Sequence, residues 1–566
     1  MAQATASSDR DLASTQDART QAQRAKQAAP RLAEFSQDQI DRIVDALAAA
    51  TRPRADEFAR LAVEETGYGV VADKIQKNLF ASDRVYQFIR PMKTVGVIGR
   101  DEARRVIEIA EPFGVVAAVV PSTNPTSTAI YKILIALKAR CPIVISPHPS
   151  AAQCITRVAA VMADAALGAG APEGAISWMQ TVTLEGTQEL MRHRDVAVIL
   201  ATGGMGLVRA AYSAGKPAYG VGPGNAPAYI ERTADTAKAV RDIVTGKTFD
   251  NGLLCSSENS VVVDRAVADE VRREFQRQGA YFLAPAEADQ LARVLVTPQR
   301  LPNPKLVGRT ARAIAGEVGL KVPAETRVLI AELAGVGRDF PLSIEKLCPV
   351  LSYYVVADWL EGCERCIQIL RYGGMGHTMA IHSRNDDIIL QFGLKKPAFR
   401  IVVNTPTTHG SIGLTTGLDP AMTLGCGGYG GNITSDNISP RHLLNVKRLA
   451  YELIPAVRSE DAPVPPRRAT PLPQVKPPAR ADGVGAAALA AQLETLMTPP
   501  GGPAPPVEGR PAEASAVAAF VCEQDVKEAI ARGRKIVVGE RTIITPAARD
   551  LAETAKVLVA AVWPRS

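Results

Sequence analysis

Apolar side chains recur at three- and four-residue spacing through the first part of the chain, residues 14–90. Ala, Ile, Leu and Phe follow this spacing in FSQDQIDRIVDALAAA and again in ADEFARLAVEET. Such spacing places the apolar groups on one face of a helix. The sequence therefore predicts a set of amphipathic helices ahead of any sheet.

From residue 94 onwards the helical spacing gives way to short apolar runs. The runs at 114–121, 142–146 and 195–202 read GVVAAVVP, PIVIS and DVAVILAT, with Ala-rich helical stretches between them. A second set, which includes NSVVVD, RVLIAEL and FRIVVNT, lies within residues 246–403. Continuous apolar strands that alternate with helices are typical of a parallel sheet covered on both faces. The pattern predicts an α/β chain with two such domains.

Proline marks a change of texture near the C-terminus. Residues 461–515 contain 13 of the 40 prolines. We expect an extended, disordered Pro/Ala-rich linker over 458–515, because such sequences lack a buriable apolar pattern. One Ala-rich stretch inside it, 483–497, predicts a short amphipathic helix.

The last segment, 516–566, has the texture of an ordered module again. FVCEQDVKEAIARG predicts a helix that ends at Gly533. KIVV and RTII, separated by Gly539 and Glu540, predict a hairpin, and a further helix is expected to begin at Pro546.

Composition and charge argue against several classes of protein. The chain is 46% hydrophobic and 22% charged, as in globular proteins, and its apolar runs are shorter than the roughly 18–20 residues that span a bilayer. The 65 basic residues exceed the 58 acidic ones without forming a basic block, so neither nucleic acid nor a membrane is an expected partner. The opening MAQATASSDRDLAST lacks the apolar core of a secretory signal. Together with eight sparsely placed cysteines, this favours reduced thiols and a cytoplasmic location.

One cysteine lies in polar surroundings. Cys255 stands in TFDNGLLCSSEN (248–259), a short loop between two periodic segments. A thiol in such a loop can be exposed and activated, whereas a cysteine on an apolar helix is inert. Packing is the usual role of a single cysteine, but turn-forming and hydrogen-bonding neighbours favour a nucleophile here. By contrast, Cys363 and Cys366 form a CxxC in a helical stretch without further metal-spaced ligands, so no metal site is predicted.

Two glycine-rich turns follow predicted strands. ATGGMG (201–206) runs from a strand into a helix, and GVGPGNAP (220–227) forms a second turn. A glycine turn that opens a helix can bring backbone N–H groups up to a phosphate. Neither turn matches the GxGxxG pattern, so each can equally be an ordinary loop. The glycine-rich stretch at 404–435 has the same two readings, a surface loop or a loop packed near a site.

Six motifs in a fixed order carry a family resemblance. PSTNP, SPHPS, ATGG, GVGPGNAP, TFDNGLLCSSEN and EKLCPV resemble the aldehyde dehydrogenase superfamily, and more narrowly its CoA-acylating acetaldehyde and propionaldehyde dehydrogenases. GMGHT and TLGCGGYGGN are similar to the same branch. The resemblance covers residues 14–455. It implies a Rossmann-type NAD-binding domain plus an α/β catalytic domain.

The resemblance also implies residue roles. Cys255 matches the nucleophile, Asn124 the oxyanion donor, and His377 a residue that lines the cleft and assists thiol transfer, although a histidine in a glycine-rich turn is more often structural. Glu345 matches the glutamate that holds the nicotinamide ribose. The remaining cofactor contacts are expected at Ser122, Thr123, Ser146, His148, Thr202, Gly203, Gly204 and Gly222. NAD is the expected cofactor, but the neutral His148 leaves NADP open; no metal is expected.

One departure from the hydrolytic relatives indicates the second substrate. Those enzymes read E-L-G-G-K where this chain reads GVGPG, so Gly220 stands in place of the glutamate that activates water. A thioester on Cys255 then needs a nucleophile such as the thiol of coenzyme A. We expect conversion of a short aldehyde, with propionaldehyde favoured over acetaldehyde, to acyl-CoA. The alternatives are a hydrolytic or semialdehyde-specific dehydrogenase and a catalytically silent cargo protein.

The resemblance divides the chain and suggests its partners. The segment 516–566 is similar to extensions on enzymes of bacterial microcompartments, and the helix at 483–497 on its linker resembles an encapsulation peptide. Either segment implies docking to shell or core proteins inside such a compartment; a tail without a partner is the alternative. Strands around 92–112 and 433–452 are expected to pair subunits into a homodimer or homotetramer. The expected parts are an N-terminal and NAD-binding region (1–240), a thiol domain (241–435), a return arm (436–457), the linker (458–515) and a targeting extension (516–566).

Overall fold

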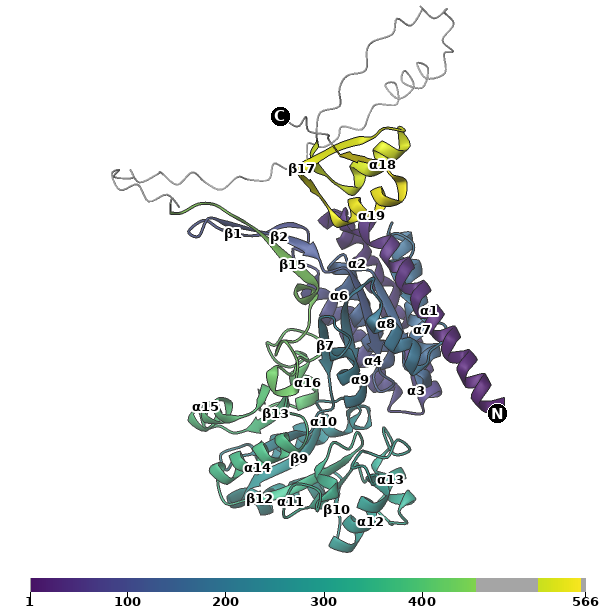
Figure 1. The fold of residues 1–566 in the computed structure, drawn as a ribbon. Coiled ribbons are helices and arrows are strands. Elements are labelled where there is room, and N and C mark those ends of the chain that lie inside the picture. The colour runs from purple at the N-terminus through teal and green to yellow at the C-terminus, as the bar shows by residue number, and fades with distance from the viewer. Residues whose placement is uncertain (1, 455–517, 561–566) are drawn as a thin grey trace, which may run out of the picture. The chain divides into compact units, whose positions relative to one another are not determined.

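A computed structural model of the protein describes residues 2–454 and 518–560 (Figure 1). The predicted linker and its helix at 483–497 lie outside the described residues. The chain divides into two units, Met1–Val475 and Lys476–Ser566. In the described ranges no helix is both long and apolar enough to cross a bilayer.

The N-terminal helices form as the periodicity predicts. Ser36 caps the second of them, since its Oγ accepts from the Gln39 N–H while Gln39 Oε1 accepts from the Ser36 N–H at 2.8 Å. Their apolar faces lie in the core. In order they are α1 (Ala2–Ala33), α2 (Gln37–Thr51), α3 (Ala55–Thr66), α4 (Val71–Leu79), the π-helical η2 (Phe80–Val85) and α5 (Tyr86–Ile89).

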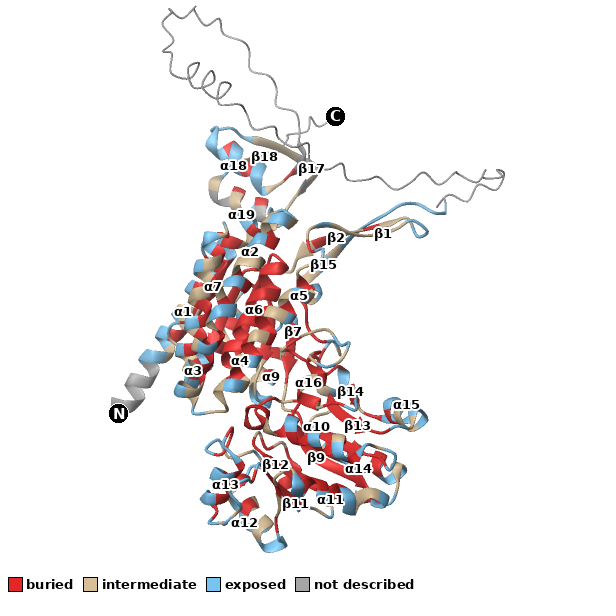
Figure 2. Ribbon diagram, turned by 180° about the vertical axis from the view of Figure 1, so that it is seen from behind, coloured by how far each residue is buried: buried red, intermediate tan, exposed pale blue. Residues whose placement is uncertain are grey.

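A five-stranded parallel sheet follows, in the order β5-β4-β3-β6-β7. Every residue of β3 and of helix α6 is buried, which accounts for the continuously apolar sequence of β3 (Figure 2). The chain leaves β3 toward one edge of the sheet and returns to its other side at β6, so the strand order reverses between β3 and β6. Open α/β sheets bind ligands at this switch point, beyond the carboxyl ends of the strands. The elements are β3 (Val115–Val120), α6 (Pro125–Lys138), β4 (Ile143–Pro147), α7 (Ala152–Gly168), β5 (Ile176–Trp178), α8 (Leu184–Arg192), β6 (Val196–Thr202), α9 (Met205–Tyr212) and β7 (Ala218–Val221).

A second, seven-stranded parallel sheet has the order β10-β11-β12-β9-β8-β13-β14. The chain enters it at β8, ahead of the boundary at residue 240 that the sequence suggests. The strands are β8 (Ala226–Ile230), β9 (Glu258–Asp264), β10 (Ala280–Phe282), β11 (Val328–Glu332), β12 (Val350–Val356), β13 (Gly376–His382) and β14 (Ala398–Val403). The helices are α10 (Thr236–Thr248), α11 (Ala268–Arg277), α12 (Pro285–Leu295), α13 (Ala311–Glu317), α14 (Trp359–Tyr372), α15 (Asp386–Lys395) and α16 (Thr407–Ser411).

The two segments expected to form an arm pair with each other. β1 (Gly96–Asp101), β2 (Val106–Pro112) and β15 (Leu444–Ala450) form a three-stranded antiparallel sheet in the order β1-β2-β15. Most residues of β15 are exposed or partly exposed. The return of the chain at β15 thus joins residues that are more than three hundred positions apart.

The C-terminal unit is a small α/β module, and one prediction for it is wrong. The expected hairpin around Gly539 and Glu540 is instead a single strand, β17, which pairs in parallel with a strand on each side. KIVV and RTII therefore belong to one strand, because the crossover helices place β16 and β18 beside it. The elements are β16 (Ala518–Val521), α18 (Glu523–Ala531), β17 (Ile536–Ile544), α19 (Pro546–Ala555) and β18 (Leu558–Ala560).

Candidate active site

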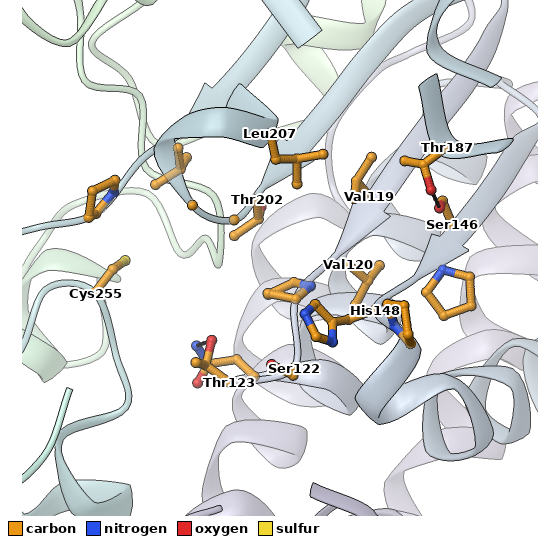
Figure 3. A pocket seen from close by; sticks show the side chains of 18 of the residues that line it. Val119, Val120, Ser122, Thr123, Ser146, His148, Thr187, Thr202, Leu207 and Cys255 are labelled. Carbon is orange, nitrogen blue, oxygen red and sulfur yellow. Dashed lines mark hydrogen bonds between the residues drawn. The ribbon is translucent and has the colours of Figure 1, made fainter. Parts of the chain in front are cut away.

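A cavity of about 450 Å³ lies at the switch point of the five-stranded sheet. Segments that follow β3, β4 and β6 line it, and Cys255 faces them from the loop before β9 (Figure 3). All the predicted site residues except His377 line this one cavity. They are Ser122, Thr123, Asn124, Ser146, His148, Thr202, Gly203, Gly204, Gly222, Cys255 and Glu345.

The loop that carries Cys255 has an unusual backbone. It begins with the 3-10 turn η4 (Phe249–Gly252), in which Asp250 and Asn251 have φ angles of 50° and 53°. Asp and Asn tolerate this left-handed region better than other side chains do. Asn251 Nδ2 also donates to the Gly308 carbonyl at 2.8 Å, which fixes the loop just ahead of the thiol.

The thiol of Cys255 is half-buried and faces the cavity. Burial raises its pKa to about 12, the negative charge of Glu345 adds to this effect, and Arg400 opposes it. Both burial and a nearby negative charge disfavour a thiolate. In the free protein the thiol is therefore protonated at neutral pH.

Asn124 is positioned as a hydrogen-bond donor. It directly precedes helix α6, and its Oδ1 accepts from Lys77 Nζ at 2.6 Å. Its Nδ2 donates to Thr123 Oγ1 at 3.2 Å. Because an ammonium can only donate, these contacts identify which end of the amide carries the hydrogens. One N–H of the Asn124 amide remains for a ligand.

The glycine turns bring backbone up to the cavity. Gly204 is the N-cap of α9, and Gly222 lies in the turn after β7. Thr202 Oγ1 is buried beside them without a hydrogen-bond partner. An orphaned hydroxyl and free N–H groups at a helix start fit the phosphates of a dinucleotide.

Glu345 faces the cavity from the second domain. Its Oε1 accepts from the Gly224 N–H at 2.9 Å. Burial raises its pKa to about 8, although that hydrogen bond and two lysines, Lys247 and Lys346, lower it. The second carboxylate oxygen is free to accept from a ligand hydroxyl.

The side of the cavity lined by Ser146, His148 and Thr187 is neutral. The hydroxyls of Ser146 and Thr187 are 2.8 Å apart, and His148 Nδ1 accepts from the Ser150 N–H at 3.1 Å. Burial lowers the pKa of His148. Its ring is consequently uncharged near pH 7.

Two predicted positions differ from expectation in the structure. His377 does not line the cavity, because it belongs to the interior strand β13 and is 1% exposed. Its Nδ1 is 3.0 Å from Thr378 Oγ1, its Nε2 has no partner, and burial lowers its pKa to about 3. His377 lies behind the second glycine turn, where a Cβ on Gly224 would be 3.3 Å from its Cδ2.

Gly220, the residue that stands in for the hydrolytic glutamate, is also outside the cavity. A Cβ there would lie 2.7 Å from Tyr212 Oη and 2.8 Å from Val208 Cγ1, so no larger side chain fits. The residues of this turn that do reach the cavity are Val221, Gly222 and Pro223, none of which can act as a base.

Sequence reasoning missed the buried charges next to the cavity. Lys74 and Lys77 of α4 pair with Asp250 of η4. The only signal in the sequence was a pair of lysines three positions apart in a predicted helix. Among the described residues no group of three or more His, Cys, Asp or Glu side chains is placed to hold a metal ion.

A cysteine and an oriented amide thus share one cavity at the switch point of the five-stranded sheet. The chain belongs to the aldehyde dehydrogenase family, whose profile matches residues 3–282. It is 48% identical to an acetylating aldehyde dehydrogenase from Geobacillus thermoglucosidasius, covering 79% of this chain and 99% of that one with a TM-score of 0.78.

Two further comparisons show the range of the relatives. A succinate-semialdehyde dehydrogenase (acetylating) from Clostridium kluyveri is 38% identical, with 76% of this chain and 94% of that one covered. A propionaldehyde dehydrogenase from the fucose utilisation bacterial microcompartment of Clostridium phytofermentans is 29% identical, with 77% and 98% covered and a TM-score of 0.69. The Geobacillus and C. kluyveri relatives are both named as acetylating enzymes. The chain spans about half the length of the aldehyde-alcohol dehydrogenases that it also matches.

Proposed function

We propose that the protein oxidises a short-chain aldehyde with NAD⁺ and coenzyme A to acyl-CoA and NADH. The observation that carries this proposal is one cavity that holds Cys255, Asn124 and the segments after β3, β4 and β6. A nucleophile, an oxyanion donor and a dinucleotide cradle are thus within reach of one substrate carbonyl.

The first half-reaction follows from the placement of Cys255 and Asn124. The sulfur would bond to the aldehyde carbon as the thiol proton passes to solvent water, and the carbonyl oxygen would become the alkoxide of a thiohemiacetal. Asn124 Nδ2 and the Cys255 backbone N–H would stabilise this alkoxide. NAD⁺, held by the segments after β3, β4 and β6, would supply the acceptor for the hydride that leaves this carbon, and Cys255 would then carry an acyl thioester.

The second half-reaction is transfer to a thiol. No side chain on the turn that includes Val221, Gly222 and Pro223 can deprotonate water. The thiol of coenzyme A takes the acyl group and restores the Cys255 thiol, with the overall release of one proton. Exchange of one thioester for another is nearly isoenergetic, so this step needs no further driving force.

We assign the two sheets different tasks. The N-terminal helices and the five-stranded sheet, which ends at Val221, would hold the cofactor at Ser122, Thr123, Ser146, His148, Thr202, Gly203, Gly204 and Gly222. The second domain, whose sheet begins at β8, would supply Cys255 and let Glu345 accept from the nicotinamide ribose. NAD is proposed over NADP by analogy with the family, since the neutral ring of His148 selects neither.

The substrate test is NADH formation with a series of aldehydes. We propose propionaldehyde as the preferred substrate and acetaldehyde as the next; the C. kluyveri relative makes succinate semialdehyde the competing candidate. The purified protein should be assayed with C2–C5 aldehydes and with succinate semialdehyde, each with and without coenzyme A. CoA-dependent NADH formation greatest at C3 supports the proposal. Equal rates of NADH formation without coenzyme A, with free acid as the product, would contradict the proposal.

The remaining parts of the chain are proposed to determine location and assembly. The compact unit at 518–560 would be a targeting extension that docks to shell or core proteins of a bacterial microcompartment, and the linker at 458–515 would be its tether. A compartment would confine a volatile, reactive aldehyde.

The sheet of β1, β2 and β15 would pair subunits into a homodimer or homotetramer, with light scattering after size exclusion as the test.

A further inference from the structure

Three charged side chains are buried just outside the cavity wall. Lys74 and Lys77 come from helix α4, and Asp250 comes from the 3-10 turn that precedes Cys255. Their side chains are 2%, 3% and 0% exposed, respectively. Charges this deeply buried are costly unless each is paired and hydrogen-bonded. Because the burial of these charges is costly, we expect the cluster to have a specific role.

Asp250 joins its turn to helix α4 through several bonds. Its Oδ1 accepts from the Val70 N–H at 2.7 Å, and its Oδ2 accepts from Lys74 Nζ at 3.0 Å and also from Lys77 Nζ. Its own backbone N–H donates to Asp73 Oδ2 at 2.7 Å. These contacts compensate for the left-handed backbone at Asp250 and fix the start of the thiol loop.

The two lysines also reach the loop that carries the oxyanion donor. Lys77 Nζ donates to Asn124 Oδ1 at 2.6 Å, and Lys74 Nζ donates to the Thr123 carbonyl at 3.3 Å. A charge-assisted bond to the amide oxygen holds that oxygen away from the cavity and strengthens the amide N–H groups as donors. Lys77 is thus a direct connection between Asp250 and the Asn124 side chain.

We propose that Lys77 is a positioning residue that orients and polarises Asn124, and that Asp250 holds both Lys77 and the Cys255 loop in register. One buried ion cluster would then set the distance between the nucleophile and the oxyanion donor. This inference rests on the proposed function, because Asn124 needs a developing alkoxide to act upon.

Substitution of Lys77 has a matched control in Lys74. Lys77→Met removes the bond to the Asn124 amide but leaves Asp250 paired with Lys74. Lys74→Met removes an equivalent charge from Asp250 but touches only a backbone carbonyl. Loss of an oriented oxyanion donor costs about 10²–10³ in kcat. We expect kcat for NADH formation to fall about 100-fold in Lys77→Met, with KM for the aldehyde changed by no more than about twofold, and to fall at most about threefold in Lys74→Met.

A double-mutant cycle separates positioning from a structural role. Asn124→Ala should lose about as much activity as Lys77→Met, and the two changes together should cost little more than either one. If Lys77 had only a structural role, the fold-losses in kcat of the two single variants would multiply in the double variant. If Lys77→Met does not fold, Lys77→Gln keeps an N–H donor and is expected to retain an intermediate kcat.

Several outcomes would overturn the inference. Equal losses in the Lys77 and Lys74 variants, or multiplicative losses with Asn124→Ala, would remove the assigned role while leaving the proposed reaction intact. A kcat in Lys77→Gln as low as in Asn124→Ala together with normal folding would do the same. Absence of aldehyde-dependent NADH from the parent protein would overturn both proposals.

Discussion

A Cβ atom on Gly224 would lie 2.0 Å from the backbone carbonyl oxygen of Cys255. The second glycine turn and the thiol loop are therefore in direct backbone contact. Gly224→Ala must displace one of them, and displacements of about 1 Å at a reacting group can cost 10²-fold in rate. We expect kcat to fall by at least about tenfold and the melting temperature to decrease. Gly206→Ala is the control, since no atom lies within 4 Å of a Cβ there; equal effects in both variants would contradict the packing argument.

Cys255 should react slowly with alkylating agents in the free protein. Burial raises the pKa of its thiol to about 12. Only the thiolate is alkylated, so below that pKa the rate rises about tenfold per pH unit. We expect iodoacetamide labelling to increase steadily from pH 7 to 10, as followed by peptide mapping, which separates Cys255 from the half-buried Cys522. A plateau below pH 9 would show that the free thiol is already activated.

Glu345→Gln tests two effects of one carboxylate. Glu345 raises the pKa of Cys255 and is proposed to hold the nicotinamide ribose. The carboxyl has a pKa of about 8, so it gains charge as the pH rises through 8 and then opposes the thiolate more strongly. The neutral glutamine should speed Cys255 alkylation a few-fold above pH 8 and raise KM for NAD⁺ about tenfold. Unchanged alkylation would mean that the charge of Glu345 does not reach the thiol.

The acyl-enzyme should accumulate when coenzyme A is withheld. With no base on the Gly222 turn, hydrolysis of the Cys255 thioester is expected to be slow. Mixing enzyme, NAD⁺ and aldehyde should give a burst of about one NADH per chain, and intact-mass analysis should find an acyl group on Cys255. Added coenzyme A should restore turnover. Cys255→Ala should abolish both the burst and the adduct, and its retention of either would identify another nucleophile.

Removal of residues 458–566 should separate catalysis from location. Residues 518–560 form a unit with its own apolar core, around Val521, Val526 and Ala548. The truncated enzyme is expected to keep kcat and KM within about twofold. In cells that form microcompartments, a fluorescent fusion of the truncated enzyme should no longer co-localise with the shell. Persistent co-localisation would assign the docking surface to residues 1–457.

The sequence predicted the residues that line the cavity, but it did not predict the buried charged residues that hold them in position. Asn124 and Cys255 follow strands in recognisable motifs, and a parallel sheet brings the ends of its strands together. Lys77 and Asp250 are 173 positions apart and come from different elements. Their pairing depends on how α4 packs against the thiol loop, which no local pattern encodes.

Two predictions differ from the structure, for different reasons. The family resemblance placed His377 at the cleft, whereas its glycine-rich turn favoured a structural role, and β13 is an interior strand that buries the side chain. KIVV and RTII were predicted to form a hairpin because two apolar runs are separated by two residues that include a glycine. Instead β17 is one strand, which pairs in parallel with β18 over Ile536–Val538 and with β16 at Val538, Ile543 and Ile544. Here tertiary pairing overrode a local signal.

The π-helical segment η2, directly after α4, sets the direction in which the lysine pair faces relative to the core residues that follow it. A π turn takes up one more residue than an α turn, which rotates the side chains that follow it by about 100° relative to those before it. Lys74 and Lys77 thereby face the thiol loop while Val85 and Ile89 remain in the core. A helix with one residue fewer is expected to keep either the core contacts or the lysine contacts, because the rotation would be lost. Deletion of a single residue within 80–85 is thus expected to separate the lysines from the thiol loop or to move Val85 and Ile89 out of the core.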